Sequence, residues 1–281
     1  MKTRNVDQKL AVITGGSSGL GLAIGEALAN EGFDLLLIAR DELKLTSVKR
    51  ELTEKYKVKI HIASIDVTNP KQVSLLRDIV LNIAPSADLV VNSAGIVSAG
   101  LLVETPLEEW DRLYAFNVKG VVSVLQTLLP DMLIQSENDG VSRHIVNIAS
   151  ASSVLNLAGM AAYSATKAGV ITISETLAHE LHSKNIGVTA VCPEFVKTPI
   201  GSSLKLFGRM DSPRSRKQVQ KMFEKSTITP AELAQRTLDA VSKNSIVIMA
   251  GRQASLANVL KRIAPNLFFK LIHKLFSSSK Q

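Results

Sequence analysis

Seven short runs of β-branched and leucine residues recur along the sequence and leave few folds open to the chain. They read LAVIT (10–14), FDLLLIA (33–39), KIHIASI (59–65), DLVVN (88–92), HIVNIA (144–149), GVTAVC (187–192) and SIVIM (245–249). Runs this short and continuously apolar are typical of strands buried on both faces. Because the segments between them are long enough for crossover helices, the pattern predicts an α/β fold with a doubly wound parallel sheet of about seven strands.

The segments between the runs indicate the domain organisation. No proline- or serine-rich linker and no internal repeat divides the 281 residues, whose 46% hydrophobic content suffices for one sizeable core. We therefore expect a single domain over residues 1–250. Residues 199–228, between the sixth and seventh runs, are polar and expected to be irregular, and they are a candidate substrate lid at the carboxyl ends of the strands. Residues 251–281 follow as a basic amphipathic extension.

The cysteine content and the N-terminal residues lead us to expect a cytoplasmic protein. Cys192 is the single cysteine, so neither an internal disulfide nor a cysteine-type metal site can form, and we predict no metal. Met1 to Leu10 lacks the apolar core of a secretory signal. The longest uncharged run, Ile145 to Thr166, contains asparagines and serines that lipid would not solvate, so no membrane span is predicted.

A glycine-rich segment, TGGSSGLG, ends the first run and precedes an alanine-rich helical pattern. Gly15, Gly19 and Gly21 allow a tight turn, a close approach of the backbone to a pyrophosphate, and close packing of helix on strand. Backbone N–H groups at the start of such a helix bind anions. The position between strand and helix favours a dinucleotide-binding loop over an ordinary turn.

The spacing T-G-x-x-x-G-x-G resembles the fingerprint of the classical short-chain dehydrogenase/reductase family, and further motifs of that family follow in order. They are Asp66 in IDVT, NSAG from Asn92 to Gly95 with Ser93 in place of an asparagine, Asn117 in FNVKG, Ser150 in NIASASS, and Tyr163 with Lys167 in YSATK. The resemblance covers about residues 8–200. It implies a Rossmann-like fold, an oxidoreductase with a small-molecule carbonyl or alcohol substrate, and a homodimer or homotetramer.

The predicted cofactor site combines the family positions with the chemistry of the glycine loop. Its residues are Thr14, Gly15, Ser17, Ser18, Gly19, Leu20, Gly21, Arg40, Asp66, Val67, Asn92, Ala94, Gly95, Tyr163, Lys167, Pro193, Val196 and Thr198. By the resemblance, Asp66 contacts the adenine and Lys167 binds the ribose next to the nicotinamide. The segment PEFVKT, which contains Val196 and Thr198, matches the loop that holds the carboxamide.

The predicted catalytic residues are Asn117, Ser150, Tyr163 and Lys167. Tyr163 and Lys167 lie four residues apart, so they share one face of a helix. A lysine ammonium there is expected to lower the phenol pKa from about 10 and to make Tyr163 a general acid and base. The Ser150 hydroxyl is expected to stabilise charge on the same substrate oxygen. By the resemblance, Asn117 holds a water that links Lys167 to solvent. The alternative for Tyr163 and Lys167 is an ordinary helix surface.

The end of the second run bears on cofactor choice. Ala39 stands where the family's NAD-selective acid sits, and Arg40 follows it. A guanidinium suits a 2′-phosphate, and Ser17 could add a hydroxyl contact, so NADPH and NADP+ are preferred over NADH. Asp41 is the feature that speaks against this preference, and a solvated strand-end arginine is the alternative for Arg40.

The loop after the sixth run departs from the family pattern at Glu194, where the family has glycine. If that backbone requires a positive φ, glutamate would be strained there. The functional alternative is that Glu194 or Phe195 lines the substrate entrance.

The excess positive charge is confined to the C-terminal end. The formal net charge is +8, yet residues 1–239 carry 26 basic and 25 acidic side chains, and no acid follows Asp239. From Asn266 onward, helical spacing places apolar residues on one broad face, and Pro265 fits the first turn of that helix; the face consists of Leu267, Phe268, Phe269, Leu271, Ile272, Leu275 and Phe276. A similar stripe precedes it, formed by Leu256, Val259, Leu260 and Ile263. Two interpretations stay open: a helix pair packed on the body or on a second subunit, or residues 252–281 lying on an anionic membrane surface. So many large apolar residues argue against nucleic acid.

These features together predict an NADPH-dependent oxidoreductase that interconverts a ketone or aldehyde and an alcohol. The layout loosely resembles members acting on lipophilic substrates of the 3-ketosphinganine, steroid or acyl type. The alternative is a non-catalytic NADPH-binding or scaffolding protein attached through its C-terminal extension.

Overall fold

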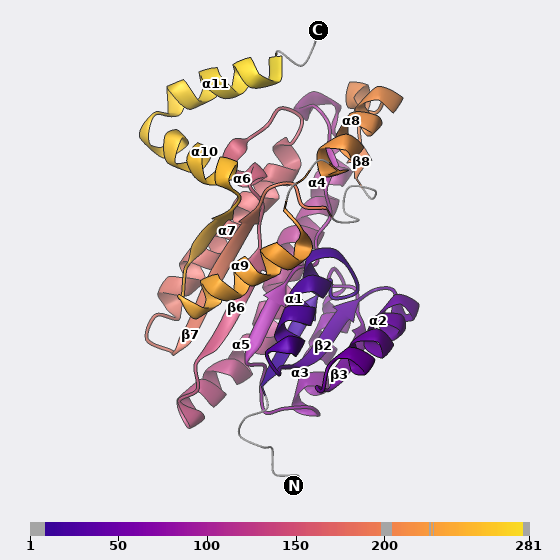
Figure 1. Cartoon of the computed structure of the whole chain (residues 1–281), viewed down its shortest axis with the longest axis vertical. Coiled ribbons are helices and arrows are strands. Elements are labelled where there is room, and N and C mark those ends of the chain that lie inside the picture. The colour runs from indigo at the N-terminus through magenta and orange to yellow at the C-terminus, as the bar shows by residue number, and fades with distance from the viewer. Residues whose placement is uncertain (1–8, 198–203, 225, 227, 278–281) are drawn as a thin grey trace.

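Seven strands form one parallel sheet in the order β3-β2-β1-β4-β6-β7-β9 (Figure 1). The computed structural model describes residues 9–197, 204–224, 226 and 228–277. The strands are β1 (Leu10–Thr14), β2 (Asp34–Ala39), β3 (Ile60–Ser64), β4 (Leu89–Asn92), β6 (Arg143–Ile148), β7 (Ile186–Pro193) and β9 (Val247–Ala250). Each predicted run overlaps one of them, which confirms the Rossmann-like, doubly wound fold.

Helices cover both faces of this sheet. They are α1 (Gly19–Asn30), α2 (Glu42–Lys55), α3 (Pro70–Leu81), α4 (Leu107–Tyr114), α5 (Gly120–Asp139), α6 (Ser152–Leu155), α7 (Ala161–Glu180), α8 (Pro213–Glu224), α9 (Pro230–Ser242), α10 (Arg252–Ile263) and α11 (Pro265–Ser277). Shorter elements are η1 (Leu102–Glu104), the π-helix η2 (Ala115–Lys119), η4 (Gly208–Met210), and the paired strands β5 (Ser98–Ala99) and β8 (Lys205–Leu206).

Burial on both faces explains why the strands are continuously apolar. In β1, Leu10 and Val12 pack with buried side chains of α3, α5 and α7, whereas Ala11 and Ile13 pack with those of α1, α2 and α9. Since successive side chains of a strand point to opposite faces, neither set can be polar without burying an unsatisfied group. This double core fixes the carboxyl ends of the strands at one edge, where parallel α/β sheets bind their ligands.

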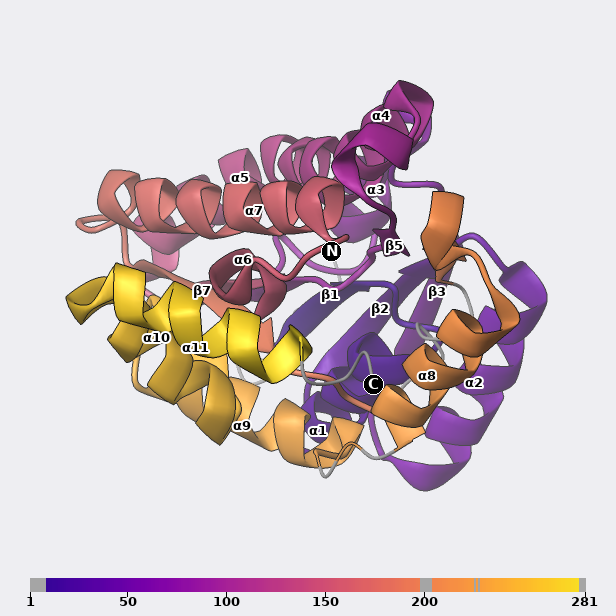
Figure 2. The same cartoon turned by 90° about the horizontal axis from the view of Figure 1, so that it is seen from above.

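The described part of the predicted lid is more ordered than the sequence indicated. Residues 213–224 form α8, so the prediction of an irregular segment is wrong there. The Ser212 hydroxyl accepts a hydrogen bond from Ser215 N at 3.1 Å, and Pro213 occupies the first helical turn. A capping serine followed by proline is a helix-start signal that outweighs the polarity of the segment. Figure 2 shows α8 on one side of the carboxyl edge of the sheet, with α10 and α11 on the other.

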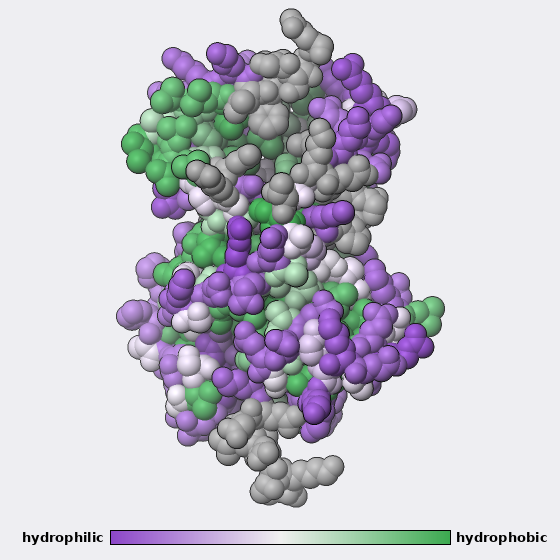
Figure 3. Space-filling model, viewed as in Figure 1, coloured by the Kyte–Doolittle hydropathy of each residue, from purple (hydrophilic) through white to green (hydrophobic). Residues whose placement is uncertain are grey.

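The C-terminal extension consists of two helices, and Pro265 begins the second of them as predicted. α10 packs on α6 and β9, and α11 packs on α10. Phe268 is 1% exposed and anchors α11, but other apolar side chains face solvent, so the predicted broad face is divided. We define the C-terminal apolar surface as the exposed side chains Leu256, Val259, Ile263, Leu267, Phe269 and Leu271. Figure 3 shows apolar side chains gathered over α10 and α11.

Across the described part of the chain, none of the helices combines the length and the apolar character required to cross a bilayer.

Candidate active site

Ser150 and Tyr163 come together beyond the carboxyl end of β6. Tyr163, in the first turn of α7, is 8% exposed, and its phenol is hydrogen-bonded to the Ser150 hydroxyl. Backbone hydrogen bonds from Ala149 N to Val191 O (2.7 Å) and from Ala151 N to Pro193 O (2.8 Å) extend the β6–β7 pairing past Ser150. The serine is therefore held on both sides by backbone.

The Ser150 oxygen also accepts hydrogen bonds from its own loop. Ser152 N donates to Ser150 Oγ at 3.2 Å, and Ser152 Oγ donates at 3.0 Å. Because these contacts use the lone pairs of Ser150 Oγ, the hydroxyl proton of Ser150 is directed to an acceptor outside its loop, which is the Tyr163 oxygen in this structure and can be a substrate oxygen when one is bound.

Lys167 and Asn117 meet over the backbone of Gly95. Lys167 Nζ donates to Ile148 O at 2.7 Å, and Asn117 Oδ1 accepts from Ile96 N at 2.9 Å. A Cβ built on Gly95 would lie 3.3 Å from Lys167 Nζ and 3.4 Å from Asn117 Oδ1, so a side chain there would crowd both groups. The structure thus brings all four predicted catalytic residues into one region.

Asn117 lies in the π-helix η2, and it has a partner that the sequence did not predict. Its amide nitrogen donates to Ile96 O at 3.0 Å and to Thr166 Oγ1 at 3.1 Å. Thr166 in turn donates to Tyr163 O at 2.8 Å. Thr166 follows Tyr163 by three residues and so shares its helix face, which is the signal that could have identified it. π-Helical turns inside α-helices are common at functional sites.

Burial determines the protonation of Tyr163 and Lys167. Burial raises the pKa of Tyr163 to about 12, against which the hydrogen bond from Ser150 acts. Burial lowers the pKa of Lys167 to about 8. The predicted lowering of the tyrosine pKa is wrong for this structure, because desolvation of the phenolate outweighs the favourable contact. At neutral pH the phenol is therefore protonated and can donate a proton.

The glycine loop packs tightly against the NSAG turn. Gly15 has φ +69°, and a Cβ on it would lie 2.9 Å from Ala94 N. A Cβ on Gly21 would lie 2.5 Å from Gly15 O, which no real side chain tolerates. Thr14 Oγ1 accepts hydrogen bonds from Ser93 N (3.1 Å) and Ala94 N (3.2 Å). The loop is therefore restricted to glycine at these two positions, and Thr14 ties it to β4.

The remaining loop residues lie at the N-terminus of α1. Ser18 is the N-cap, and its side chain makes no capping hydrogen bond to the described helix. Gly19 and Leu20 form the first turn, while the Ser17 side chain is buried. The backbone N–H groups of a first helical turn have no partners within the helix, so this turn suits a pyrophosphate.

Arg40, at the end of β2, lies over an aromatic ring. Its guanidinium carbon is 5.1 Å from the centroid of Phe116, and the side chain is also exposed to solvent. The Asp41 carboxylate accepts from Lys44 N at 2.9 Å and caps α2. Asp41, whose negative charge argued against a phosphate at this position, is therefore engaged as the cap of α2.

Asp66 and Val67 follow β3. Asp66 Oδ1 accepts from Thr68 N (2.9 Å) and Thr68 Oγ1 (2.7 Å), which forms a tight turn. Val67 is buried, and a Cβ on Gly120 would lie 3.0 Å from its side chain. Glycine at 120 thus lets α5 approach the predicted adenine side of the site.

A buried polar chain links the strands beneath the site. Asn92 is 2% exposed, and its amide nitrogen donates to Asn147 Oδ1 at 2.9 Å. Asn147 donates to Ser174 Oγ at 2.9 Å. The Asn92 side chain therefore points into the core, and any cofactor contact at this position falls to the backbone. Asn147 and Ser174 were missed, although a lone polar residue in an apolar strand is a recognisable signal.

The loop after β7 follows a path that explains Glu194. Positive φ among the described non-glycine residues occurs at Asn156, Asn185 and Asn244, so Glu194 carries none of the strain that was expected. Its carboxylate accepts a hydrogen bond from the backbone N–H of Ala254 in α10.

The other predicted residues of this loop lie at its two ends. Pro193 ends β7, and Val196 is buried. Thr198 lies outside the described residues.

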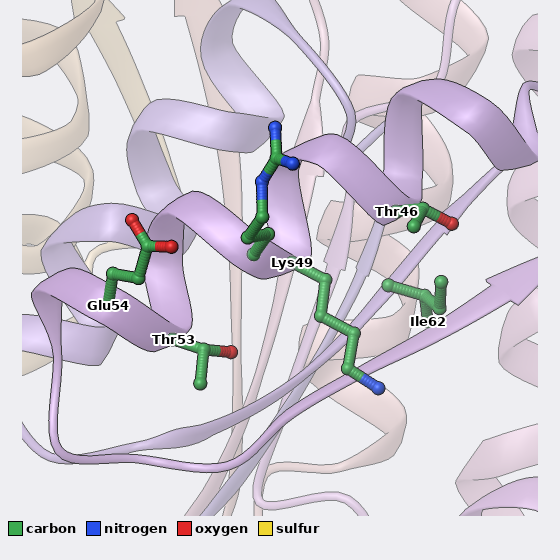
Figure 4. Close-up of a pocket in the computed structure, with 6 residues that line it drawn as sticks. Thr46, Lys49, Thr53, Glu54 and Ile62 are labelled. Atoms are coloured by element: carbon green, nitrogen blue, oxygen red, sulfur yellow. The ribbon is translucent and has the colours of Figure 1, made fainter.

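A shallow pocket elsewhere has no connection with these residues. Figure 4 shows Thr46, Lys49, Thr53 and Glu54 on α2 beside Ile62 of β3. None of its lining side chains belongs to the predicted catalytic or cofactor set, and its mixture of charges and hydroxyls points to no single ligand.

Comparison with known proteins gives a consistent family. The model of the short chain dehydrogenase family matches residues 9–206. An uncharacterised oxidoreductase of Staphylococcus saprophyticus is 35% identical over 195 residues, which are 69% of this chain and 81% of that protein.

Two solved structures are similar over most of the chain. A short chain dehydrogenase/reductase of Burkholderia phymatum, solved in complex with NAD, has a TM-score of 0.83 and 28% identity over 93% of this chain and 95% of its own. L-Sorbose reductase of Gluconobacter frateurii, solved with NADPH and L-sorbose, has a TM-score of 0.74 and 29% identity over 87% of this chain and 96% of its own.

Proposed function

This chain belongs to the short-chain dehydrogenase family of oxidoreductases, and we propose that it uses NADPH to interconvert a ketone or aldehyde and an alcohol. The observation that carries the proposal is the buried tyrosine, Tyr163, hydrogen-bonded to Ser150 and grouped with Lys167 and Asn117. The residues present also fit a dinucleotide, because the glycines at 15 and 21 occur where any side chain would collide with backbone.

The four residues divide the work on the substrate oxygen. When bound, NADPH supplies a hydride for the carbonyl carbon. Tyr163 donates its phenol proton to the carbonyl oxygen, and the Ser150 hydroxyl orients that oxygen by donating a hydrogen bond to it. Lys167 holds positive charge next to the tyrosine, and Asn117 connects this region with the NSAG turn. A Tyr163 pKa of about 12 keeps the proton in place at neutral pH, so the phenol is ready to protonate the oxygen of a carbonyl substrate.

We infer NADPH rather than NADH from the residues at the end of β2. Ala39 offers no carboxylate to a ribose, and Asp41 is engaged with Lys44 N. Arg40 is an exposed cation beside the Phe116 ring, and its guanidinium suits a 2′-phosphate.

The rival proposal is a non-catalytic NADPH-binding or scaffolding protein attached through its C-terminal helices. A protein of that kind has no physical need for a buried phenol and a buried lysine, each of which costs free energy of desolvation. The intact group of four residues therefore favours an enzyme.

We propose that residues 199–228 act as the substrate lid. β8 pairs with β5, and Glu104 accepts hydrogen bonds from Arg209 Nε (2.6 Å) and Arg209 N (3.1 Å). These contacts hold the described end of the segment close to the NSAG turn, which supports a covering role.

The proposed function is tested by NADPH oxidation with a panel of carbonyl compounds. We expect turnover with lipophilic ketones, of the 3-ketosphinganine, steroid or acyl type, to exceed turnover with small polar ketones, because Val97, Leu113 and Ala162 form an apolar cluster with Tyr163. Equal NADPH oxidation with and without every carbonyl would reject a reductase in favour of the binding protein. Faster turnover of polar ketones would reject the lipophilic substrate alone.

We further propose that the C-terminal apolar surface lies on an anionic membrane and makes the cytoplasmic protein a peripheral membrane protein. Arg262, Lys270 and Lys274 are exposed on the same two helices, and no acid occurs in residues 240–281. Exposed apolar side chains flanked by cations match the acyl boundary and the anionic headgroups of a bilayer.

Co-sedimentation with vesicles tests this surface. Vesicles of equal parts phosphatidylcholine and phosphatidylglycerol should bind the protein, and the triple variant Val259→Glu, Ile263→Glu, Leu267→Glu should bind at least about tenfold more weakly. The control variant Leu43→Glu, Leu75→Glu, Ile134→Glu changes three exposed side chains on other helices and should bind like the parent protein.

Two results would contradict the membrane surface. One is equal binding of the two triple variants. The other is a light-scattering result in which the Val259→Glu, Ile263→Glu, Leu267→Glu variant is monomeric while the control variant is dimeric. That result would show that the C-terminal apolar surface contacts a second copy of the chain. The homodimer or homotetramer that we propose for the chain should persist in both variants.

A further inference from the structure

Glu194 connects the loop after β7 with the first C-terminal helix. Its Oε1 accepts a hydrogen bond from the backbone N–H of Ala254, in the first turn of α10. That turn contains no acidic residue of its own, and the N-cap Gly251 has no side chain to supply a cap. Glu194 thus supplies the negative charge that a helix N-terminus favours.

Gly251 leaves the space that the Glu194 carboxylate occupies. Pro193 of β7 pairs with Ala250 of β9, which places Glu194 and Gly251 next to each other where the two strands end. A Cβ built on Gly251 would overlap the Glu194 carboxyl group. Its φ of 177° is open to any residue, so the space occupied by Glu194, rather than backbone conformation, is what demands glycine here.

The other end of α10 contacts the segment that follows the catalytic serine. Lys261 Nζ donates to Val154 O at 2.8 Å, and this carbonyl belongs to α6, which begins at Ser152. Partial burial lowers the pKa of Lys261, in agreement with its position between α10 and α6. α10 therefore touches both the loop after β7 and the Ser150 segment.

These contacts close a ring that begins at Ala151, the residue directly after Ser150. The Ala151 N–H donates to Pro193 O, Pro193 is followed by Glu194, Glu194 holds α10, and Lys261 of α10 returns to Val154. The segment from Ala151 to Val154 completes the ring, and Ser150 immediately precedes it. A displacement of α10 is therefore transmitted to the segment after Ser150 at two points, Ala151 and Val154.

We propose that α10 is a positioning element for Ser150 and that Glu194 and Lys261 are the residues through which it acts. The effect of α10 on catalysis rests on the proposed function, in which Ser150 orients the substrate oxygen. The contact with α10 explains the departure at Glu194, since the acid that replaces the family's glycine has its partner in the C-terminal extension. Neither residue touches the reacting atoms.

Hydrogen exchange of the full-length protein tests the ring without any substrate. Lys261→Met keeps the length of the side chain but removes the donor, and Glu194→Ala removes the acceptor. We expect both to speed exchange of the amides in residues 151–156 by about tenfold, the effect of losing one hydrogen bond. Glu194→Gln, which keeps an acceptor oxygen, should restore most of the protection, and Lys270→Met on α11 is the matched control.

Kinetics then test the catalytic meaning of the ring. Lys261→Met should lower kcat by about tenfold and leave the Kd for NADPH unchanged, because Ser150 is not assigned to the cofactor. Combining Lys261→Met with Glu194→Ala should cost less than the product of the single effects, since either change opens the same ring. Two unrelated structural defects would multiply instead.

The outcomes separate this inference from the proposed function. If Glu194→Ala speeds exchange in α10 alone and leaves residues 151–156 unchanged, α10 does not position Ser150. Full multiplication of the two kinetic effects would also overturn the inference. If exchange changes as expected but no carbonyl compound is reduced, the ring stands and the proposed function fails. If Glu194→Ala does not fold, Gly251→Ala serves in its place, because the added methyl group displaces the Glu194 carboxylate while Glu194 and Lys261 are both kept. Faster hydrogen exchange in residues 151–156 of that variant supports the inference, and unchanged exchange overturns it.

Discussion

Tyr163→Phe is expected to lower kcat by about a thousandfold while NADPH still binds with the affinity of the parent protein. The substitution removes one oxygen from a side chain that is 8% exposed, so the ring of phenylalanine fills the same space. The lost group is the proton donor, and the Ser152 hydroxyl, which also contacts Ser150 Oγ, is an aliphatic alcohol and a much weaker acid than a phenol. Steady-state NADPH oxidation gives kcat, and fluorescence titration gives the Kd for NADPH.

The matched control for this variant is Tyr114→Phe on α4. Tyr114 is 39% exposed and lies outside the predicted site, so its loss of a hydroxyl should leave kcat within about twofold of the parent value. Undiminished turnover in Tyr163→Phe would contradict its assignment as the acid. Loss of NADPH binding together with turnover would assign the tyrosine to cofactor binding instead.

Arg40→Gln is expected to lower kcat/KM with NADPH by roughly tenfold to a hundredfold and to leave kcat/KM with NADH nearly unchanged. The guanidinium would contribute a charge-assisted hydrogen bond to the 2′-phosphate, worth about 1.5 to 3 kcal/mol, and NADH has no such phosphate. Glutamine keeps a polar side chain of similar reach beside Phe116 but has no charge. Parallel kinetics with the two cofactors measure the change.

Arg50→Gln supplies the control for the cofactor experiment. Arg50 is exposed on α2 and belongs to the surface pocket of Figure 4, so the same change there should affect neither cofactor. An equal loss with NADPH and NADH in Arg40→Gln would contradict the role of Arg40 at the phosphate. A parent protein that prefers NADH would contradict the NADPH proposal itself.

The fold could be predicted because the same local requirement, burial on both faces, applies to every strand of the sheet. Each strand of the sheet is buried on both faces, so each had to be a continuous apolar run, and the runs give the strands within one or two residues. The grouping of Tyr163 and Lys167 was predictable for a similar reason, since four residues are one helical turn. The glycine positions followed from backbone conformation, which Gly15 shows with a φ of +69°.

Features that depend on tertiary contact could not be predicted. The partner of Glu194 is Ala254, sixty residues along the chain, so the residues around Glu194 could not show that its carboxylate binds the first turn of α10. The same holds for the chain from Asn92 through Asn147 to Ser174, which joins three elements. The pKa of Tyr163 depends on burial as well as on its neighbours, and burial is a property of the whole fold.

The C-terminal extension shows the limit of helical periodicity. Spacing placed Leu267 and Phe268 on one broad face, yet Phe268 is buried and Leu267 is half exposed. Periodicity gives the width of an apolar face, whereas the packing of α11 on α10 decides which part of it is covered.

The central claim is that the chain transfers hydride to a carbonyl carbon, and isotope transfer tests it most directly. The parent protein is incubated with a ketone and with NADPH that carries deuterium at the transferable C4 position, and the product alcohol is analysed by mass spectrometry. We predict that the alcohol gains one deuterium at the former carbonyl carbon, and that Tyr163→Phe forms almost none of this product. A product without deuterium, or NADPH oxidised with no alcohol formed, would contradict the claim.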